Sequence, residues 1–126
     1  SNLATLGGHV QIGKSAILGG GVLVHQYTQI GEHSLIGGGF RAVQDVPPFI
    51  IAANHPLEYK GVNIVGLKRR GFSKKDIDSI KKVYRWFFRS GGNRKTAIEK
   101  IASESPKTKV IQKILDFIKY SKRGII

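Results

Sequence analysis

The chain has 126 residues, no cysteine and a formal net charge of +13, from 21 lysines and arginines against 8 aspartates and glutamates. This length suits one domain or one piece of a larger one, and the lack of cysteine excludes disulfides and thiolate metal sites. The sequence has no apolar run long enough to span a bilayer and no charged-then-apolar signal peptide at its start.

The first third of the chain carries an aliphatic side chain at every sixth position. These positions are Leu6, Ile12, Leu18, Val24, Ile30 and Ile36. Each is followed at once by glycine, except Val24, which His25 follows. Hexapeptide repeats are typical of parallel β-helices, in which each repeat gives a short strand and a bend, and stacked coils bury the aliphatic residues. Glycine would tolerate the bend; a flexible glycine-rich segment, the alternative, would not keep branched side chains in register.

The repeat is already in phase where the sequence begins. Ala4 occupies the position of the smaller residue that stands two places before each aliphatic. A solenoid needs a cap at each end, and nothing before Ser1 could provide one. We therefore expect coils over residues 1–40, with further coils preceding them in the natural protein.

A connecting segment is expected over residues 41–72, because the six-residue pattern ends at Phe40. Its three prolines, which indicate extended or looped backbone, are Pro47, Pro48 and Pro56. We expect a short apolar strand over residues 49–53, a turn at 54–56 and a glycine-rich loop over 61–71 that ends in three basic residues.

Three helices are expected in a C-terminal helical domain over residues 73–126. Ser73 can cap the first, over 74–90, and two glycines can stop it. A second should cover 95–103, and a third should be opened by Pro106 and end near residue 121. The spacing of their apolar residues predicts a small helical cap on one end of the coil.

The positive charge is distributed unevenly along the chain. Residues 1–40 contain only Lys14 and Glu32, whereas lysine and arginine crowd residues 68–123. We interpret the coil as a neutral scaffold and expect an anionic partner at the second half. A nucleic acid, a membrane surface, a phosphorylated ligand or an acidic protein would each fit.

Five short stretches together support a more specific interpretation. They are Ala-Thr-Leu-Gly-Gly-His-Val at 4–10, Val-His-Gln at 24–26, Gln-Asp-Val-Pro-Pro at 44–48, Gly-Val-Asn-Ile at 61–64 and Gly-Leu-Lys-Arg-Arg-Gly-Phe-Ser at 66–73. With them, nearly the whole chain resembles the acyl-carrier-protein:UDP-N-acetylglucosamine O-acyltransferases, which start lipid A synthesis in Gram-negative bacteria. The stretches at 44–48 and 66–72 are far more specific than the repeats, which are shared by a broad superfamily.

The resemblance implies a left-handed parallel β-helix followed by a C-terminal helical domain, assembled as a cytoplasmic homotrimer with active sites between subunits. The family's reaction moves a 3-hydroxyacyl chain from the phosphopantetheine thioester of acyl carrier protein to the 3-hydroxyl of UDP-N-acetylglucosamine. No metal or other cofactor is implied.

This reaction needs a general base for the sugar hydroxyl and a donor for the thioester oxyanion. The resemblance implies that the base is a histidine about one coil earlier, upstream of Ser1, and that the donor is the Gly8 N–H. It makes His9, His25 and Gln26 contacts of the sugar nucleotide or the acyl-pantetheine. With three hexapeptides to a coil, Gly8 and Gln26 stack on adjacent coils roughly 4.8 Å apart, so these four residues should form one patch. Either histidine could instead be a surface residue tolerated at a corner.

The resemblance also implies that Asn63, Arg69 and Arg70 bind the UDP portion, since guanidinium forks suit a diphosphate. Plain solvated charges are the alternative for the arginines. Val65 stands where relatives often carry an acidic contact to uracil, which argues against that contact here.

Leu35 and Gly38 match the region that measures the acyl chain. His55 stands near the position where the family has a histidine that limits acyl length, although the local spacing differs. His33, between Glu32 and Ser34, is expected to be solvated.

The basic residues Lys81, Arg85 and Arg89 recur at four-residue spacing on the first predicted helix. We expect this stripe to dock the acidic carrier protein. A nucleic-acid-binding module would also explain the charge, but no reader motif appears and aromatics are not interleaved with the basic residues on a sheet. The remaining alternative is an assembly and docking fragment without chemistry of its own.

Overall fold

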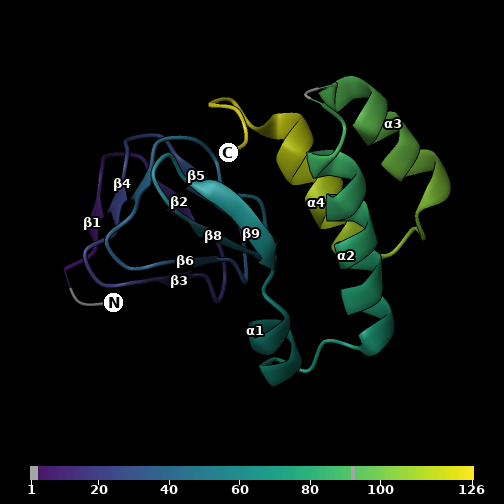
Figure 1. The fold of residues 1–126 in the computed structure, drawn as a ribbon, viewed down its shortest axis with the longest axis horizontal. Helices are drawn as coiled ribbons and strands as arrows, with labels where there is room; N and C mark the ends of the chain where they lie inside the picture. Colours follow the sequence, from purple (N-terminus) through teal and green to yellow (C-terminus); the bar gives the residue numbers. More distant parts are fainter. Residues whose placement is uncertain (1–2, 92) are drawn as a thin grey trace.

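The structure, a computed structural model, describes residues 3–91 and 93–126. Figure 1 shows a stack of short strands on one side and a group of helices on the other. The strands are β1 (Thr5–Leu6), β2 (Gln11–Ile12), β3 (Ile17–Leu18), β4 (Leu23–Val24), β5 (Gln29–Ile30), β6 (Leu35–Ile36), β7 (Arg41–Ala42), β8 (Ile50–Ala53) and β9 (Glu58–Val62). The helices are α1 (Ile64–Arg69), α2 (Lys74–Phe88), α3 (Arg94–Glu104) and α4 (Lys109–Tyr120).

The strands form a parallel β-helix with three faces. Strand order is β1-β4-β7 on the first face, β2-β5 on the second and β3-β6-β8-β9 on the third. Register joins residues one coil apart: Leu6 pairs with Val24, and Ile12 pairs with Ile30. The predicted coil of three hexapeptides is therefore confirmed.

The sixth-position aliphatics fill the coil interior. Ile30 and Ile36 are 2% and 0% exposed, whereas Leu6 and Ile12 of the first coil are 48% and 39% exposed. The difference arises because, among the residues that the structure describes, no coil covers the open end of the first one. The expectation that stacking supplies the core agrees with this pattern.

The glycines after the aliphatics do not serve the bends, contrary to the sequence prediction. Positive φ recurs three residues after each aliphatic instead, at His9, Ser15, Gly21, Tyr27, His33 and Gly39. Four of the five lie where adjacent coils touch: a Cβ added at Gly13 would lie 2.4 Å from the Glu32 nitrogen, and one at Gly31 would lie 2.3 Å from the Pro48 nitrogen. A Cβ at Gly37 would instead meet the Phe40 ring at 3.0 Å. At the other four positions, glycine is therefore required for the close approach of one backbone to the next.

Parallel pairing continues beyond residue 40, where the sequence pattern placed its end. β7 pairs with β4, and β8 pairs with β6 before β9 returns antiparallel along β8. The pattern fades because Ala42 takes the aliphatic position without a glycine after it. The predicted strand over 49–53 is confirmed as β8.

The helices match their predicted positions with two corrections. Ser73 caps α2 by accepting a hydrogen bond from the Asp76 N–H at 3.1 Å, as predicted. The residues expected to form a glycine-rich loop over 61–71 contain α1, and α4 begins at Lys109 with Thr108 as its cap rather than at Pro106. In both cases a side-chain cap fixes the helix start. No helix of the described residues is long and apolar enough to cross a membrane.

Three side-chain contacts fix the helices on the coil. The buried Tyr84 hydroxyl of α2 donates to the Pro48 carbonyl at 2.6 Å. Lys113 of α4 pairs with Glu32 at 2.9 Å. Asp45, 1% exposed, accepts from the Ser121 hydroxyl just after α4. The helices therefore hold a defined position relative to the coil corners.

Replacing Gly31 by alanine should destabilise this fold, because the added Cβ would meet the Pro48 backbone. We expect the free energy of unfolding to fall by about 1–3 kcal/mol, the usual cost of over-packing, as measured by urea denaturation. Gly8→Ala is the matched control, since a Cβ there meets no atom within 4 Å. Equal unfolding midpoints for the two variants would contradict the role assigned to the close-packed glycines.

Candidate functional site

Four of the predicted site residues lie at one corner of the coil, between the first and second faces. Gly8 and His9 follow β1, and His25 and Gln26 follow β4 on the next coil. The Tyr27 N–H donates to the Gly8 carbonyl at 2.9 Å, which fixes the stacking of the two turns. All four residues are exposed. The predicted stacking of this patch, hereafter the corner site, is confirmed.

Gly8 differs from the glycine beside it. A Cβ on Gly7 would lie 2.6 Å from the Gln26 nitrogen, so packing requires Gly7. A Cβ on Gly8 meets nothing within 4 Å, and within the described part of the chain no backbone carbonyl accepts its N–H. The Gly8 N–H is therefore open to a ligand, as an oxyanion donor must be.

Tyr27 is a member of the corner site that sequence reasoning missed. Its ring stacks on the His9 imidazole, with centroids 4.8 Å apart and planes 2° from parallel. Tyr27 is 57% exposed, although a tyrosine ring usually gains from burial. The missed signal was its spacing of one full coil from His9, the same spacing that relates Gly8 to Gln26.

The arginine pair is carried by α1. Arg69 ends the helix, and Arg70 follows as its C-cap; both are exposed. Asn63 caps the other end: its Oδ1 accepts the Gly66 N–H at 3.3 Å, and its Nδ2 donates to the His33 carbonyl at 3.0 Å. Asn63 is 5% exposed, so its amide holds α1 on the coil, a structural role that the sequence did not predict.

The prediction that His33 is solvated was wrong. His33 is 7% exposed, because the Phe72 ring meets its imidazole edge-on at 4.9 Å and the Phe49 ring stacks at 6.1 Å. This burial lowers the pKa of His33 below its ordinary value. Phe72 comes from far along the chain, so the local sequence gave no sign of the packing.

The three predicted docking residues of α2 line one groove against β9. The groove has a volume of about 430 Å³, and its lining includes Lys81, Arg85 and Arg89. Its aromatic floor includes Tyr59 and Phe88, whose rings stack at 4.1 Å. We call this feature the basic groove; it combines positive charge with an apolar base.

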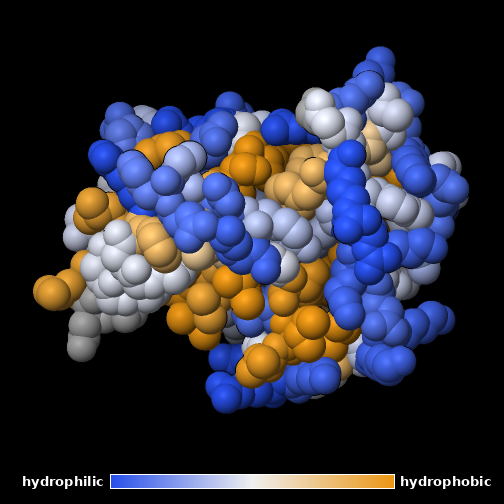
Figure 2. Space-filling view, viewed as in Figure 1, coloured by the Kyte–Doolittle hydropathy of each residue, from blue (hydrophilic) through white to orange (hydrophobic). Residues whose placement is uncertain are grey.

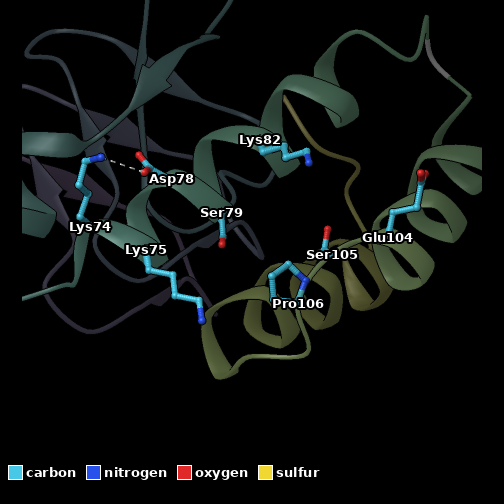
Figure 3. A pocket seen from close by; sticks show the side chains of 8 residues that line it. All are labelled: Lys74, Lys75, Asp78, Ser79, Lys82, Glu104, Ser105 and Pro106. Carbon is cyan, nitrogen blue, oxygen red and sulfur yellow. Dashed lines mark ion pairs between the residues drawn. The ribbon is translucent and has the colours of Figure 1, made fainter.

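A second groove lies between α2 and the turn that joins α3 to α4 (Figure 3). It holds lysines together with acidic residues, and Lys74 points toward Asp78, with which it pairs at 3.7 Å. This mixed charge makes it a poorer site for an anion than the basic groove. None of the site residues predicted from the sequence lines this groove.

One chain does not bring all the predicted residues together. The corner site lies between the first and second faces, whereas α1 and its arginines are held at the next corner, where His33 separates β5 from β6. Leu35 lies in β6, Gly38 follows it at the third corner, and His55 lies in the turn between β8 and β9. Among the described residues, no three His, Cys, Asp or Glu side chains gather as they would around a metal ion.

A family model described as "Udp N-acetylglucosamine O-acyltransferase; Domain 2" matches residues 45–126 of this chain. The chain belongs to this family. A relative from Thiobacillus denitrificans, named acyl-[acyl-carrier-protein]–UDP-N-acetylglucosamine O-acyltransferase, is 40% identical over 126 residues, which are all of this chain and 49% of the relative. A relative of the same name from Aliivibrio salmonicida is 45% identical over 125 residues, 99% of this chain and 48% of its own.

Solved structures agree with this family assignment. A UDP-N-acetylglucosamine acyltransferase from Bacteroides fragilis superimposes with a TM-score of 0.91 at 40% identity, over 98% of this chain and 51% of that one. The Francisella novicida enzyme of the same name gives a TM-score of 0.93 at 37% identity, over 99% and 46% of the two chains. The chain thus spans about half the length of the relatives it matches.

Asn63→Ala should release α1 from the coil, because the His33 carbonyl and the Gly66 N–H both lose their partner. We expect the free energy of unfolding to fall by about 1–3 kcal/mol, and the amides of α1 to exchange faster with solvent. Asn93→Ala is the matched control, because it removes the equivalent cap from α3 and should loosen α3 alone. Unchanged exchange in α1 would show that Asn63 does not hold it.

Proposed function

We propose that the chain is the C-terminal half of an enzyme that transfers a 3-hydroxyacyl group from acyl carrier protein to the 3-hydroxyl of UDP-N-acetylglucosamine. This is the first step of lipid A synthesis, and we place it in the cytoplasm. The observation that carries the proposal is the corner site: an open Gly8 N–H at a corner that also carries two exposed histidines, in a chain whose family is named for UDP-N-acetylglucosamine acyl transfer.

In the proposed reaction, a base takes the proton from the sugar hydroxyl, and the oxygen attacks the thioester carbonyl. The Gly8 N–H stabilises the oxyanion that forms, while His9, His25 and Gln26 hold the sugar or the acyl-pantetheine. Collapse of the tetrahedral intermediate breaks the carbon–sulfur bond, and the protonated base gives its proton to the sulfur, which leaves as the thiol of the carrier. The proposal assigns the base to an earlier coil, outside residues 1–126.

The corner site and the α1 arginines lie at different corners of one chain, which supports a homotrimer that brings them together between copies. We infer a left-handed coil in which each corner site faces the α1 arginines of a neighbouring copy, so that Arg69 and Arg70 bind the diphosphate there. Exposed apolar side chains on the outer coil faces fit such an assembly: Ile17 is 53% exposed and Leu23 is 45% exposed. In Figure 2, hydrophobic side chains lie singly and in small groups on the coil side of the molecule.

The basic groove fits the acidic carrier protein. Hydrophilic side chains dominate the helical side of the molecule (Figure 2), and we propose that Lys81, Arg85 and Arg89 on α2 dock the carrier. Charges at the rim of an interface chiefly raise the rate of encounter and make it depend on salt. Leu35, Gly38 and His55 remain assigned to the acyl pocket.

Arg69→Ala should weaken binding of UDP-N-acetylglucosamine in the protein that includes the preceding coils. Loss of one charge-assisted contact costs about 1.5–3 kcal/mol, which is roughly tenfold to a hundredfold in the dissociation constant. Calorimetric titration measures this, with Lys95→Ala, an exposed cation on α3, as the control. A dissociation constant equal to that of the wild type would remove Arg69 from the site.

Lys81→Glu combined with Arg85→Glu should raise the KM for acyl carrier protein and leave that for UDP-N-acetylglucosamine nearly unchanged. The difference from wild type should shrink as salt rises, because screening weakens the same charges in both proteins. Lys107→Glu with Lys109→Glu, at the start of α4, is the matched control. An effect on the nucleotide sugar, or none on either substrate at any salt, would show that the stripe is only a solvated helix face.

A further inference from the structure

Helix α1 cannot hold its own position. It has six residues, of which only Leu67 is buried, and helices this short are unstable in isolation. Arg69 and Arg70 lie at its end, so their positions depend on the contacts that fix α1 to the coil. Those contacts identify the residue that controls the arginines.

The anchors of α1 converge on His33. The Asn63 amide before the helix donates to the His33 carbonyl at 3.0 Å, and the Phe72 ring after the helix meets the His33 imidazole at 4.9 Å. Phe49, which accepts the Asn63 N–H at its carbonyl, packs on both rings. Backbone and side chain of one residue therefore hold the two ends of α1.

The surroundings of this imidazole favour its neutral form. Burial between two phenylalanine rings is the largest cause of its lowered pKa. Arg70 at the end of α1, Lys113 of α4 and Lys14 of the coil lower it further, and Glu32 alone opposes them. Glu32 is itself paired with Lys113 at 2.9 Å, so part of its charge is already neutralised.

We propose that His33 is a positioning residue for the arginine pair: its neutral imidazole keeps α1 docked on the coil, and its protonation undocks α1 and displaces Arg69 and Arg70. A cation at this place would be buried between aromatic rings and would face the guanidinium of Arg70. The role of the arginines toward the nucleotide sugar rests on the proposed function, whereas the docking of α1 does not.

The direction of the pH effect follows from the lowered pKa. The docked form of His33 binds a proton less readily than the undocked form, whose pKa is about 6.5. Docking is therefore complete above pH 6.5 and weakens as the pH falls from 6.5 through the lower pKa of the docked form. His33 thus sets the acid limit of nucleotide-sugar binding.

The test compares wild type with His33→Phe, which keeps a ring in the aromatic cluster but cannot be protonated. Phenylalanine tolerates the positive φ of this position, since Phe49 adopts φ 73 in the same chain. Binding of UDP-N-acetylglucosamine is titrated at pH 7.5 and 5.5 in the protein with its preceding coils; this diphosphate diester takes up no proton in that range. Tyr120→Phe, at an exposed position at the end of α4, is the control.

We expect wild type and Tyr120→Phe to lose affinity on acidification, and His33→Phe to lose much less. His9, His25 and His55 are present in all three proteins, so the difference between the profiles isolates residue 33. Parallel profiles for wild type and His33→Phe would overturn the proposal.

Hydrogen exchange provides a second readout, which uses the wild-type protein and therefore needs neither a ligand nor a variant that must fold. In the wild-type chain, protection of the Leu67 and Arg70 amides should fall below pH 6.5, after correction for intrinsic exchange, while α2 stays protected. Constant protection in α1 would overturn the positioning role. A pH-dependent α1 in a protein that binds no nucleotide sugar at any pH would support the positioning role and reject the proposed function.

Discussion

The stacking of one backbone directly on the next is the constraint on which this structure depends. Adjacent coils approach so closely at Gly13 and Gly31 that an added Cβ would lie 2.4 and 2.3 Å from the backbone of the next coil. Backbone hydrogen bonds then hold residues one coil apart in register, as in the 2.8 Å contact from the Gly7 N–H to the Val24 carbonyl. A slip in this register would separate Gly8 from Gln26, and the corner site would no longer form.

The coil and the helices divide the chemistry between them. The coil carries nearly uncharged strands and presents the open Gly8 N–H, whereas the helices carry the cations of the basic groove. The Tyr84 hydroxyl and the Lys113 ammonium bind α2 and α4 to the coil, so the groove has a fixed position relative to the corner. Under the proposed function, a large acidic donor docks on one part while its acyl group reacts on another.

The six-residue period predicted the coil, its register and the stacking of Gly8 on Gln26, because all three follow from one repeat length. It could not predict α1, since the helix depends on a bond from Asn63 to a carbonyl 30 residues earlier. The burial of His33 could not be predicted for the same reason, because tertiary packing brings Phe72 over its ring. The role of the glycines was missed because a bend and a close approach favour the same residue.

Subunit mixing tests most directly whether the site is divided between copies, as we propose. In the proposed homotrimer of the protein with its preceding coils, His25→Ala damages the corner site and Arg69→Ala damages the arginine pair, so each variant alone should be nearly inactive at low concentrations of the nucleotide sugar. Unfolding the two together and reassembling them in equal amounts should restore about a quarter of the wild-type activity, because each mixed trimer of a cyclic assembly contains one interface with both parts intact. Activity no higher than that of the separate variants would contradict a site shared between neighbouring copies.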